Sequence, residues 1–171
     1  LDKKQGRGYC CYNNYSRCNN MRRTDMKGAF NLAESLGFLV SGANASMRAG
    51  FNRAIGEAGI AATAEQWGVL NIVRSSPGII QSELAERSMK DRTNVTRMLD
   101  LLEKNGHIER RSDADDRRSY RIYITAAGVS LLDRLRPLAV AVNKKATRGF
   151  TGEERRLLTG LLKKIHANMS E

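Results

Sequence analysis

The chain has 171 residues, 41% hydrophobic and 27% charged, which suits one domain or two small domains that share a core and excludes a disordered polymer. Its formal net charge of +11 predicts a polyanionic partner, either nucleic acid or an anionic membrane surface. The sequence has no stretch of about 18 apolar residues and no secretory pattern at its start, so we expect a cytoplasmic protein without a transmembrane helix.

Residues 1–27 show neither helical nor strand periodicity and are expected to form a tail that is disordered or derived from a vector. They hold seven Lys or Arg residues against two Asp residues, a net charge of +5. Because Met21 and Met26 directly precede the first periodic segment, the residues before them are either native or an added extension. If they are native, their cations are candidates for contacts with DNA phosphates.

All of the cysteines lie in this tail, at Cys10, Cys11 and Cys18. A metal-binding or oxidant-sensing cluster is one hypothesis for them, but their spacing matches no common zinc pattern and no His is near. The segment after the tail therefore has neither a disulfide nor thiolate chemistry, and we predict no metal and no cofactor.

Apolar residues between Ala29 and Glu57 have spacings that fit one long amphipathic helix. Gly56 and Gly59 interrupt this pattern. The sequence Thr63-Ala-Glu-Gln66 has the form of a capping box, which predicts a helix through Trp67, Leu70 and Val73 that Pro77-Gly78 closes.

A helix-turn-helix is predicted next, from a short helix over Gln81–Met89 and a second helix over Arg92–Asn105 with Asp91 as its N-cap. The second helix has one apolar stripe that we expect to be buried, and Gly106 has the residue type that ends helices in a left-handed conformation. The stripe consists of Val95, Met98, Leu99 and Leu102.

A β-hairpin follows, because residues 108–111 and 117–125 flank a polar turn and the second segment alternates with period two. Thr125 is expected to cap a helix that runs to about Arg148 and bends at Pro137. Thr151-Gly-Glu-Glu154 is a second capping box and opens a leucine-rich final helix. The predicted class is mainly α with a small β-hairpin, divided into 28–60 (N-terminal dimerisation helix), 61–125 (winged helix-turn-helix lobe) and 126–171 (C-terminal dimerisation helices).

The second helix of the helix-turn-helix carries side chains suited to reading DNA at its N-terminal end, which is the end that meets base edges in such motifs. Their guanidinium groups can donate two hydrogen bonds to guanine, their amide can pair with adenine, and their hydroxyls can contact bases or phosphates. A solvated helix face with a few cations is the alternative. The candidates are Arg92, Thr93, Asn94, Thr96 and Arg97.

The tip of the hairpin is too polar to be buried, so it meets either water or a partner. An arginine there fits the minor groove, where the negative potential is enhanced in A·T-rich DNA, and Asp116 is placed to orient a neighbouring arginine. A solvent-exposed hairpin with balanced charge is the alternative.

Together these segments resemble the MarR family of winged helix-turn-helix regulators. The resemblance rests on Gln81-Ser-Glu-Leu-Ala-Glu-Arg87, Asp91-Arg-Thr-Asn-Val-Thr-Arg97, Leu101-Leu-Glu-Lys-Asn-Gly106 and Arg110-Arg-Ser-Asp-Ala-Asp-Asp-Arg-Arg118. It implies a homodimer that binds a pseudo-palindromic operator in double-stranded DNA, often as a repressor released by a small effector. It also implies that Asp116 and Arg118 form the wing pair, with Arg118 in the minor groove and Arg117 on a phosphate.

Independently, the leucine-rich final helix predicts an apolar stripe that a twofold partner would cover, with packing inside one chain as the alternative. The resemblance also implies a cleft for a phenolic or other aromatic effector, which Met47, Phe51 and Trp67 are candidates to line unless they are simply core residues.

Other functions are less well supported by the sequence. The resemblance implies that a peroxide-sensing member would carry a reactive cysteine in the first long helix, and the segment 29–57 has none. It also implies that a zinc-sensing member would need several His and carboxylate ligands, whereas this chain has only His107 and His166. Neither His has a nucleophile partner by sequence, and no phosphate loop or metal motif is present, so we expect no enzyme. A winged-helix module that binds protein and not specific DNA remains the alternative function.

Overall fold

The computed structural model describes residues 31–113 and 119–170. The tail 1–27 with its cysteines, and the turn that holds Asp116, Arg117 and Arg118, lie outside the described residues. The described elements are the short 3-10 helix η2 (Leu32–Glu34), α1 (Leu36–Glu57), α2 (Ala64–Ser75), β1 (Ile79–Ile80), α3 (Gln81–Ser88), α4 (Arg92–Lys104), β2 (Ile108–Ser112), β3 (Tyr120–Ile124), α5 (Ala126–Ala146) and α6 (Gly152–Asn168).

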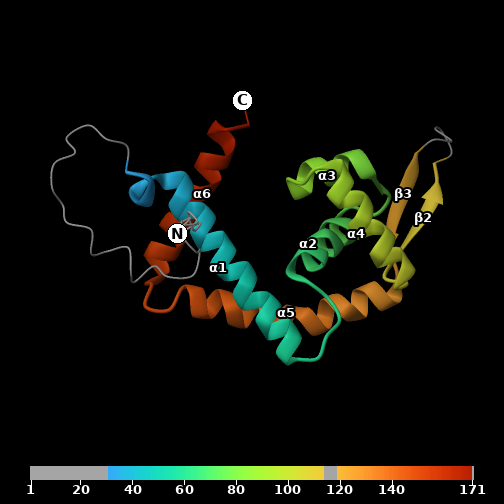
Figure 1. The fold of residues 1–171 in the computed structure, drawn as a ribbon, viewed down its shortest axis with the longest axis horizontal. Helices are drawn as coiled ribbons and strands as arrows, with labels where there is room; N and C mark the ends of the chain where they lie inside the picture. The colour runs from blue at the N-terminus through green and yellow to red at the C-terminus, as the bar shows by residue number, and fades with distance from the viewer. Residues whose placement is uncertain (1–30, 114–118, 171) are drawn as a thin grey trace, which may run out of the picture.

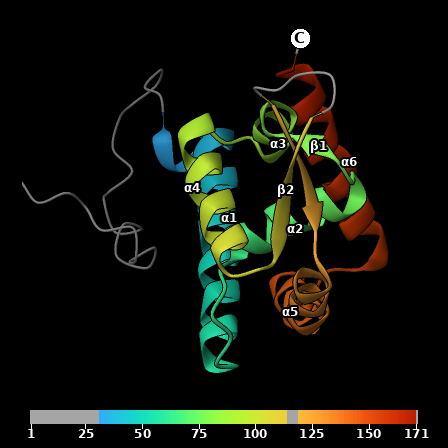
Figure 2. The ribbon, with the colours of Figure 1, turned by 90° about the vertical axis from the view of Figure 1, so that its right-hand side faces the viewer.

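These elements form a lobe and a helical end joined by α5 (Figure 1). The lobe consists of α2, α3, α4 and the sheet, and α6 lies at the opposite end of the molecule. The second view looks nearly along α5, with the β2–β3 hairpin above it (Figure 2). The predicted class, mainly helical with a small antiparallel sheet, is confirmed.

One hydrophobic core runs through the lobe and reaches α1 and α5. The stripe predicted on α4 is buried, with Val95, Leu99 and Leu102 at most 1% exposed and Met98 partly buried beside them. Leu70 from α2 and Leu135 from α5 are fully buried in the same core. Burial of one stripe fixes which face of α4 points outward.

The sheet has the order β1-β3-β2, and both pairings are antiparallel. Ile122 of β3 lies opposite Ile79 of β1 and Arg110 of β2. The hairpin was predicted, but β1 was missed because a strand of two residues has no period to detect. This short strand joins the wing to the start of α3.

Hydrogen bonds at the helix ends confirm the predicted capping residues. Thr63 and Thr151 form complete capping boxes with Gln66 and Glu154, and Asp91 accepts a hydrogen bond from the backbone N–H of Asn94. Gly106 has φ of 71°, as expected for the residue that ends α4.

The prediction of one helix from about Ala29 to Glu57 was wrong at its N-terminal end. Asn31 caps a separate turn, η2, by accepting a hydrogen bond from the N–H of Ala33, and Ser35 has an extended backbone before α1 begins at Leu36. Local capping by the Asn side chain competes with continuation of the helix, which an apolar pattern does not reveal.

Candidate nucleic-acid interface

The exposed face of α4 carries four of the five side chains predicted to read bases. Arg92, Thr93, Asn94 and Arg97 are exposed, while Thr96 is only partly so. Since Val95 and Leu99 are anchored in the core, these four residues lie on the solvent-exposed side of a helix of fixed orientation. A helix presented this way fits the major groove of B-DNA.

Asp91 holds the first turn of α4. Its carboxylate accepts a hydrogen bond of 2.9 Å from the backbone N–H of Asn94 and a second from the side-chain amide of Asn94. The backbone bond is the main cause that lowers the pKa of Asp91 below its ordinary value. Asn94 is therefore turned towards its own N-cap in this structure.

Thr96 connects the two helices of the helix-turn-helix. Its Oγ1 donates to the carbonyl oxygen of Arg92 over 2.8 Å and accepts a hydrogen bond of 2.6 Å from Nε2 of Gln81. The hydroxyl is thus already used inside the protein. Sequence reasoning missed Gln81, because only the tertiary arrangement brings the first residue of α3 to α4.

Arg110 connects the β2–β3 hairpin to α4. From β2 its guanidinium reaches Oδ1 of Asp100 over 2.7 Å and Oε2 of Glu103 over 3.1 Å, and its side chain is only 19% exposed. The backbone N–H of Arg110 also donates to Glu103. Two carboxylates on α4 therefore hold β2 at a fixed position.

A second ion pair lies at the end of the hairpin next to the turn 114–118. Oδ2 of Asp113 lies 3.0 Å from Nε of Arg121, and the side chain of Asp113 is nearly buried. On the same hairpin the guanidinium of Arg111 lies 4.5 Å from the centre of the Tyr123 ring. The predicted pair of Asp116 and Arg118 lies in the turn 114–118, outside the described residues, so it stays a prediction.

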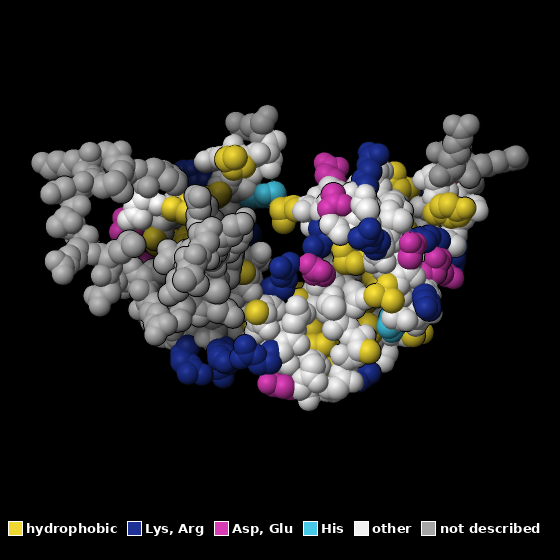
Figure 3. Space-filling view, in the orientation of Figure 1, with side chains coloured by type: hydrophobic (Ala, Val, Ile, Leu, Met, Phe, Trp, Pro, Cys, Tyr) yellow, Lys and Arg dark blue, Asp and Glu magenta, His cyan; other side chains and the backbone are white. Residues whose placement is uncertain are grey.

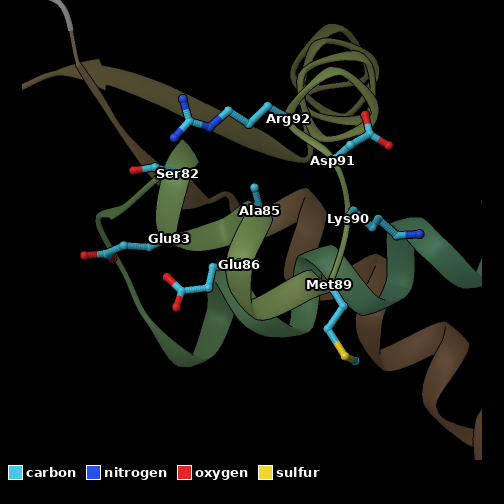
Figure 4. A pocket seen from close by; sticks show the side chains of 8 residues that line it. All are labelled: Ser82, Glu83, Ala85, Glu86, Met89, Lys90, Asp91 and Arg92. Carbon is cyan, nitrogen blue, oxygen red and sulfur yellow. The ribbon is translucent and has the colours of Figure 1, made fainter. Parts of the chain in front are cut away.

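A shallow hollow of about 470 Å³ separates α3 from the start of α4. Figure 4 shows Glu83 and Glu86 on its α3 side, while Arg92 extends over the start of α3 near Ser82. Both acidic and basic side chains line this hollow, and residues 87–121 as a whole hold ten cations and seven anions. The candidate interface is therefore mixed in charge, as the space-filling view of this lobe also shows (Figure 3).

A larger cleft of about 650 Å³ lies between α1, α2, the turn after α3, and α5. The three residues predicted to line an effector site, Met47, Phe51 and Trp67, all line it. The rings of Phe51 and Trp67 pack edge to face, with centroids 5.3 Å apart. Phe51 both lines the cleft and belongs to the core, and its role in an effector site stays a prediction.

Two absences concern the described residues. Within 31–113 and 119–170, no helix is long and apolar enough to cross a membrane. The same residues contain no cluster of three or more His, Cys, Asp or Glu side chains that could hold a metal ion.

The fold and the exposed face of α4 define a winged helix-turn-helix protein, and comparisons with known proteins agree. The MarR family model matches residues 62–120. MarR from E. coli in its reduced form is 30% identical, with a TM-score of 0.66 over 77% of this chain and 96% of that one. A cysteine mutant of the same protein complexed with operator DNA is 28% identical, with a TM-score of 0.72 over 80% of this chain and 96% of that one. The chain belongs to the MarR family.

Among curated proteins, the putative transcriptional regulatory protein for the hcr operon of Thauera aromatica is 31% identical over 61% of this chain. The uncharacterized HTH-type transcriptional regulator YybA of Bacillus subtilis is 31% identical over 57% of it. The matched segments span 63% and 65% of the lengths of those two relatives.

Proposed function

We propose that this chain is a sequence-specific DNA-binding transcriptional regulator that binds a pseudo-palindromic operator as a homodimer. The observation that carries the proposal is the exposed face of α4. The hydrogen bond between Gln81 and Thr96 holds this helix against α3, and the ion pairs of Arg110 with Asp100 and Glu103 hold it against β2. Because α4 is already ordered in the free protein, binding DNA avoids much of the entropic cost of ordering its backbone and side chains. The operator complex of the E. coli relative supports double-stranded DNA as the partner.

Base contacts are assigned to the exposed residues Arg92, Thr93, Asn94 and Arg97, of which Asn94 would first release its side-chain bond to Asp91. Thr96 serves on this proposal as a positioning residue, because its hydroxyl is bonded to Gln81 and Arg92. Contacts from the wing, with Arg117 on a phosphate and Arg118 oriented by Asp116 in the minor groove, complete the proposed interface.

The homodimer is proposed from apolar side chains that a monomer leaves in water. In α6, Leu157, Leu158, Leu161 and Leu162 are each at least 41% exposed, and Leu32, Leu36, Leu39 and Val40 in and before α1 are exposed as well. An apolar surface of this kind marks an interface. A twofold axis through it would present two copies of α4 to successive turns of the major groove.

We further propose that the bound protein represses transcription and is released by a small effector, with aromatic molecules as the candidate class, in the cleft lined by Met47, Phe51 and Trp67. The cleft lies between α1 at the proposed dimer interface and the turn that precedes α4. A ligand bound in the cleft would contact the turn before α4 directly, and could in this way affect the position of α4.

The test is selection of DNA from a random pool by the full chain, followed by titration of the selected site and of a scrambled site by fluorescence anisotropy. We expect a palindromic consensus, preference for the selected site, and a logarithm of affinity that falls steeply and linearly with the logarithm of salt concentration. Failure to enrich any sequence, together with equal affinity for both sites, would favour the protein-binding module.

A further inference from the structure

The helical end of the molecule carries a larger excess of positive charge than the lobe proposed to read DNA. Residues 134–168 hold nine Lys or Arg residues and two carboxylates, Glu153 and Glu154, whereas residues 87–121 hold ten cations and seven anions. All nine of these Lys and Arg residues are exposed. An excess of charge outside the proposed interface predicts a second contact with a polyanion.

Five of these cations lie where α5 ends and α6 begins, and we call them the basic corner. Lys144 of α5 and Arg155 of α6 line one shallow groove of about 500 Å³, and no carboxylate is among the described residues that line it. Within 31–113 and 119–170, no member of the basic corner forms an ion pair, whereas Arg48, Arg74 and Arg110 each lie within 4 Å of a carboxylate. The members are Lys144, Lys145, Arg148, Arg155 and Arg156.

The homodimer proposed above leaves part of the basic corner in water. Arg156 comes two residues before Leu158, which is about 200° around an α-helix, so the two side chains leave opposite sides of α6. Burial of the leucines against a partner therefore keeps Arg156 exposed. Each dimer then carries two basic corners.

The basic corner and the β2–β3 hairpin lie at different edges of the molecule. Lys and Arg side chains gather at the lower edge, below the end of α5 that leads to α6 (Figure 3). In the same orientation the hairpin rises towards the upper edge (Figure 1). A straight duplex that contacts α4 and the hairpin therefore leaves the basic corner free for other phosphates.

We propose that the basic corner binds the phosphate backbone of a second DNA duplex, so that a dimer on its operator bridges two DNA segments. This inference rests on the operator-bound dimer of the proposed function and adds a second partner surface to it. Duplex DNA carries one negative charge per about 1.7 Å of its axis, the highest density of charge among ordinary nucleic-acid partners. Contacts from Lys and Arg to phosphates carry no sequence information, so any duplex is a suitable second segment.

The test measures energy transfer between a donor-labelled duplex of the selected operator and an acceptor-labelled duplex of random sequence, both mixed with the full chain. Anisotropy of the donor duplex reports operator binding in the same sample. We expect transfer with the wild type at low salt and its steep loss as salt rises, because phosphate contacts release counterions. An acceptor-labelled single strand of the same length should be captured less well, since its charge density is lower.

Charge variants identify the surface that captures the second duplex. Lys145→Gln combined with Arg148→Gln should weaken this capture at least about tenfold and leave operator affinity within about twofold of the wild type. The matched control, Arg134→Gln combined with Arg136→Gln, removes the same charge from α5 outside the basic corner and should capture the second duplex as the wild type does.

Absence of energy transfer in the wild type would overturn the proposal, and so would transfer that persists when Lys145 and Arg148 are changed. Equal losses in the control variant would overturn it as well, because they would indicate a general effect of charge. Preference for the single strand would point to stacking on Phe150, which is 43% exposed between the two helices, and would also contradict duplex binding. An unbound donor duplex would overturn both this inference and the proposed function, whereas a bound donor without transfer would overturn this inference alone. Circular dichroism of each variant confirms that a loss of capture is not a loss of fold.

Discussion

The side-chain amide of Gln81 donates a 2.6 Å hydrogen bond to Oγ1 of Thr96, which joins the first residue of α3 to the second turn of the recognition helix. Both residues are partly buried. The bond fixes the crossing of the two helices at the point where α4 is proposed to enter the groove.

Thr96→Val keeps the branched shape of the side chain but removes this acceptor. The amide of Gln81 then loses its partner in a partly buried place, so we expect a loss of about 1 to 2 kcal/mol in the free energy of unfolding. Urea denaturation measures this loss. The matched change Thr93→Val, at an exposed position of the same helix, should alter stability by less than about 0.5 kcal/mol. Equal effects of the two substitutions would contradict the role assigned to Thr96.

Arg110→Met preserves much of the aliphatic stem but removes the bonds to Asp100 and Glu103. We expect stability to fall by about 1 to 2 kcal/mol, since the side chain is mostly buried but both carboxylates are partly exposed. Amide hydrogen exchange in β2 should accelerate as the hairpin separates from α4. Arg111→Met, which changes a more exposed side chain on the same strand, is the control, and the proposed coupling fails if its β2 exchange rises equally.

The capping carboxylate of Asp91 predicts a pH dependence. Hydrogen bonds from Asn94 lower the pKa of Asp91 in the folded state, so its contribution to stability is present above the unfolded pKa and is lost as the pH falls through the folded pKa. Asp91→Asn retains a capping oxygen without charge. We expect the wild type to exceed this variant in stability near neutral pH, and the difference to shrink on acidification. Thermal melts over a pH series test this, and a difference that does not vary with pH would refute it.

Gly128 permits a close approach between α5 and the residue that precedes β2. A Cβ at this position would lie 2.1 Å from the carbonyl oxygen of His107 and 2.7 Å from Cγ1 of Ile124. Gly128→Ala should therefore cost about 2 to 4 kcal/mol, because backbone has to move. On α2, a Cβ added at Gly68 would meet no atom within 4 Å apart from its chain neighbours and the backbone of its own helix. Gly68→Ala should therefore stabilise the protein by about 0.5 to 1 kcal/mol. Chemical denaturation compares the two, and similar outcomes would contradict the predicted clash.

Met89 ends α3 in the left-handed conformation, with φ of 52° and ψ of 40°, although it has a side chain. This conformation is unfavourable for residues with a Cβ and favours glycine. Met89→Gly should raise the free energy of unfolding by about 0.5 to 1 kcal/mol, since the Met side chain is 79% exposed and contributes little packing. A lower melting temperature for this variant would show that packing of the Met89 side chain stabilises the protein more than its left-handed backbone destabilises it.

Much of the fold could be predicted because its signals are local. The capping boxes at Thr63 and Thr151, the N-cap Asp91 and the apolar stripe of α4 each lie within a few consecutive residues, and all four are confirmed. The start of α1 was wrong because Asn31 forms a local turn that the apolar spacing of this segment does not encode.

The candidate site was harder to predict, because its supporting contacts join residues distant in sequence. Thr96 was proposed for DNA contact, but its position relative to Gln81 follows only from the packing of α3 against α4. Likewise, nothing in the pattern around Glu65, which lines the cleft, indicates its ion-pair partners Arg48 and Lys90, which lie 17 and 25 residues away. Such contacts depend on the angles between helices, and periodicity within one helix carries no information about those angles.

The two bonds from Arg110 to α4 have a consequence for allostery. Because Arg110 anchors β2 to Asp100 and Glu103, we expect the element proposed for the major groove and the hairpin proposed for the minor groove to move together. In the proposed dimer, the placement of both elements on an operator would then depend on the orientation of each lobe as a whole. An effector of the kind proposed above would need to tilt that lobe only by a small amount to put both elements out of register with their grooves at once.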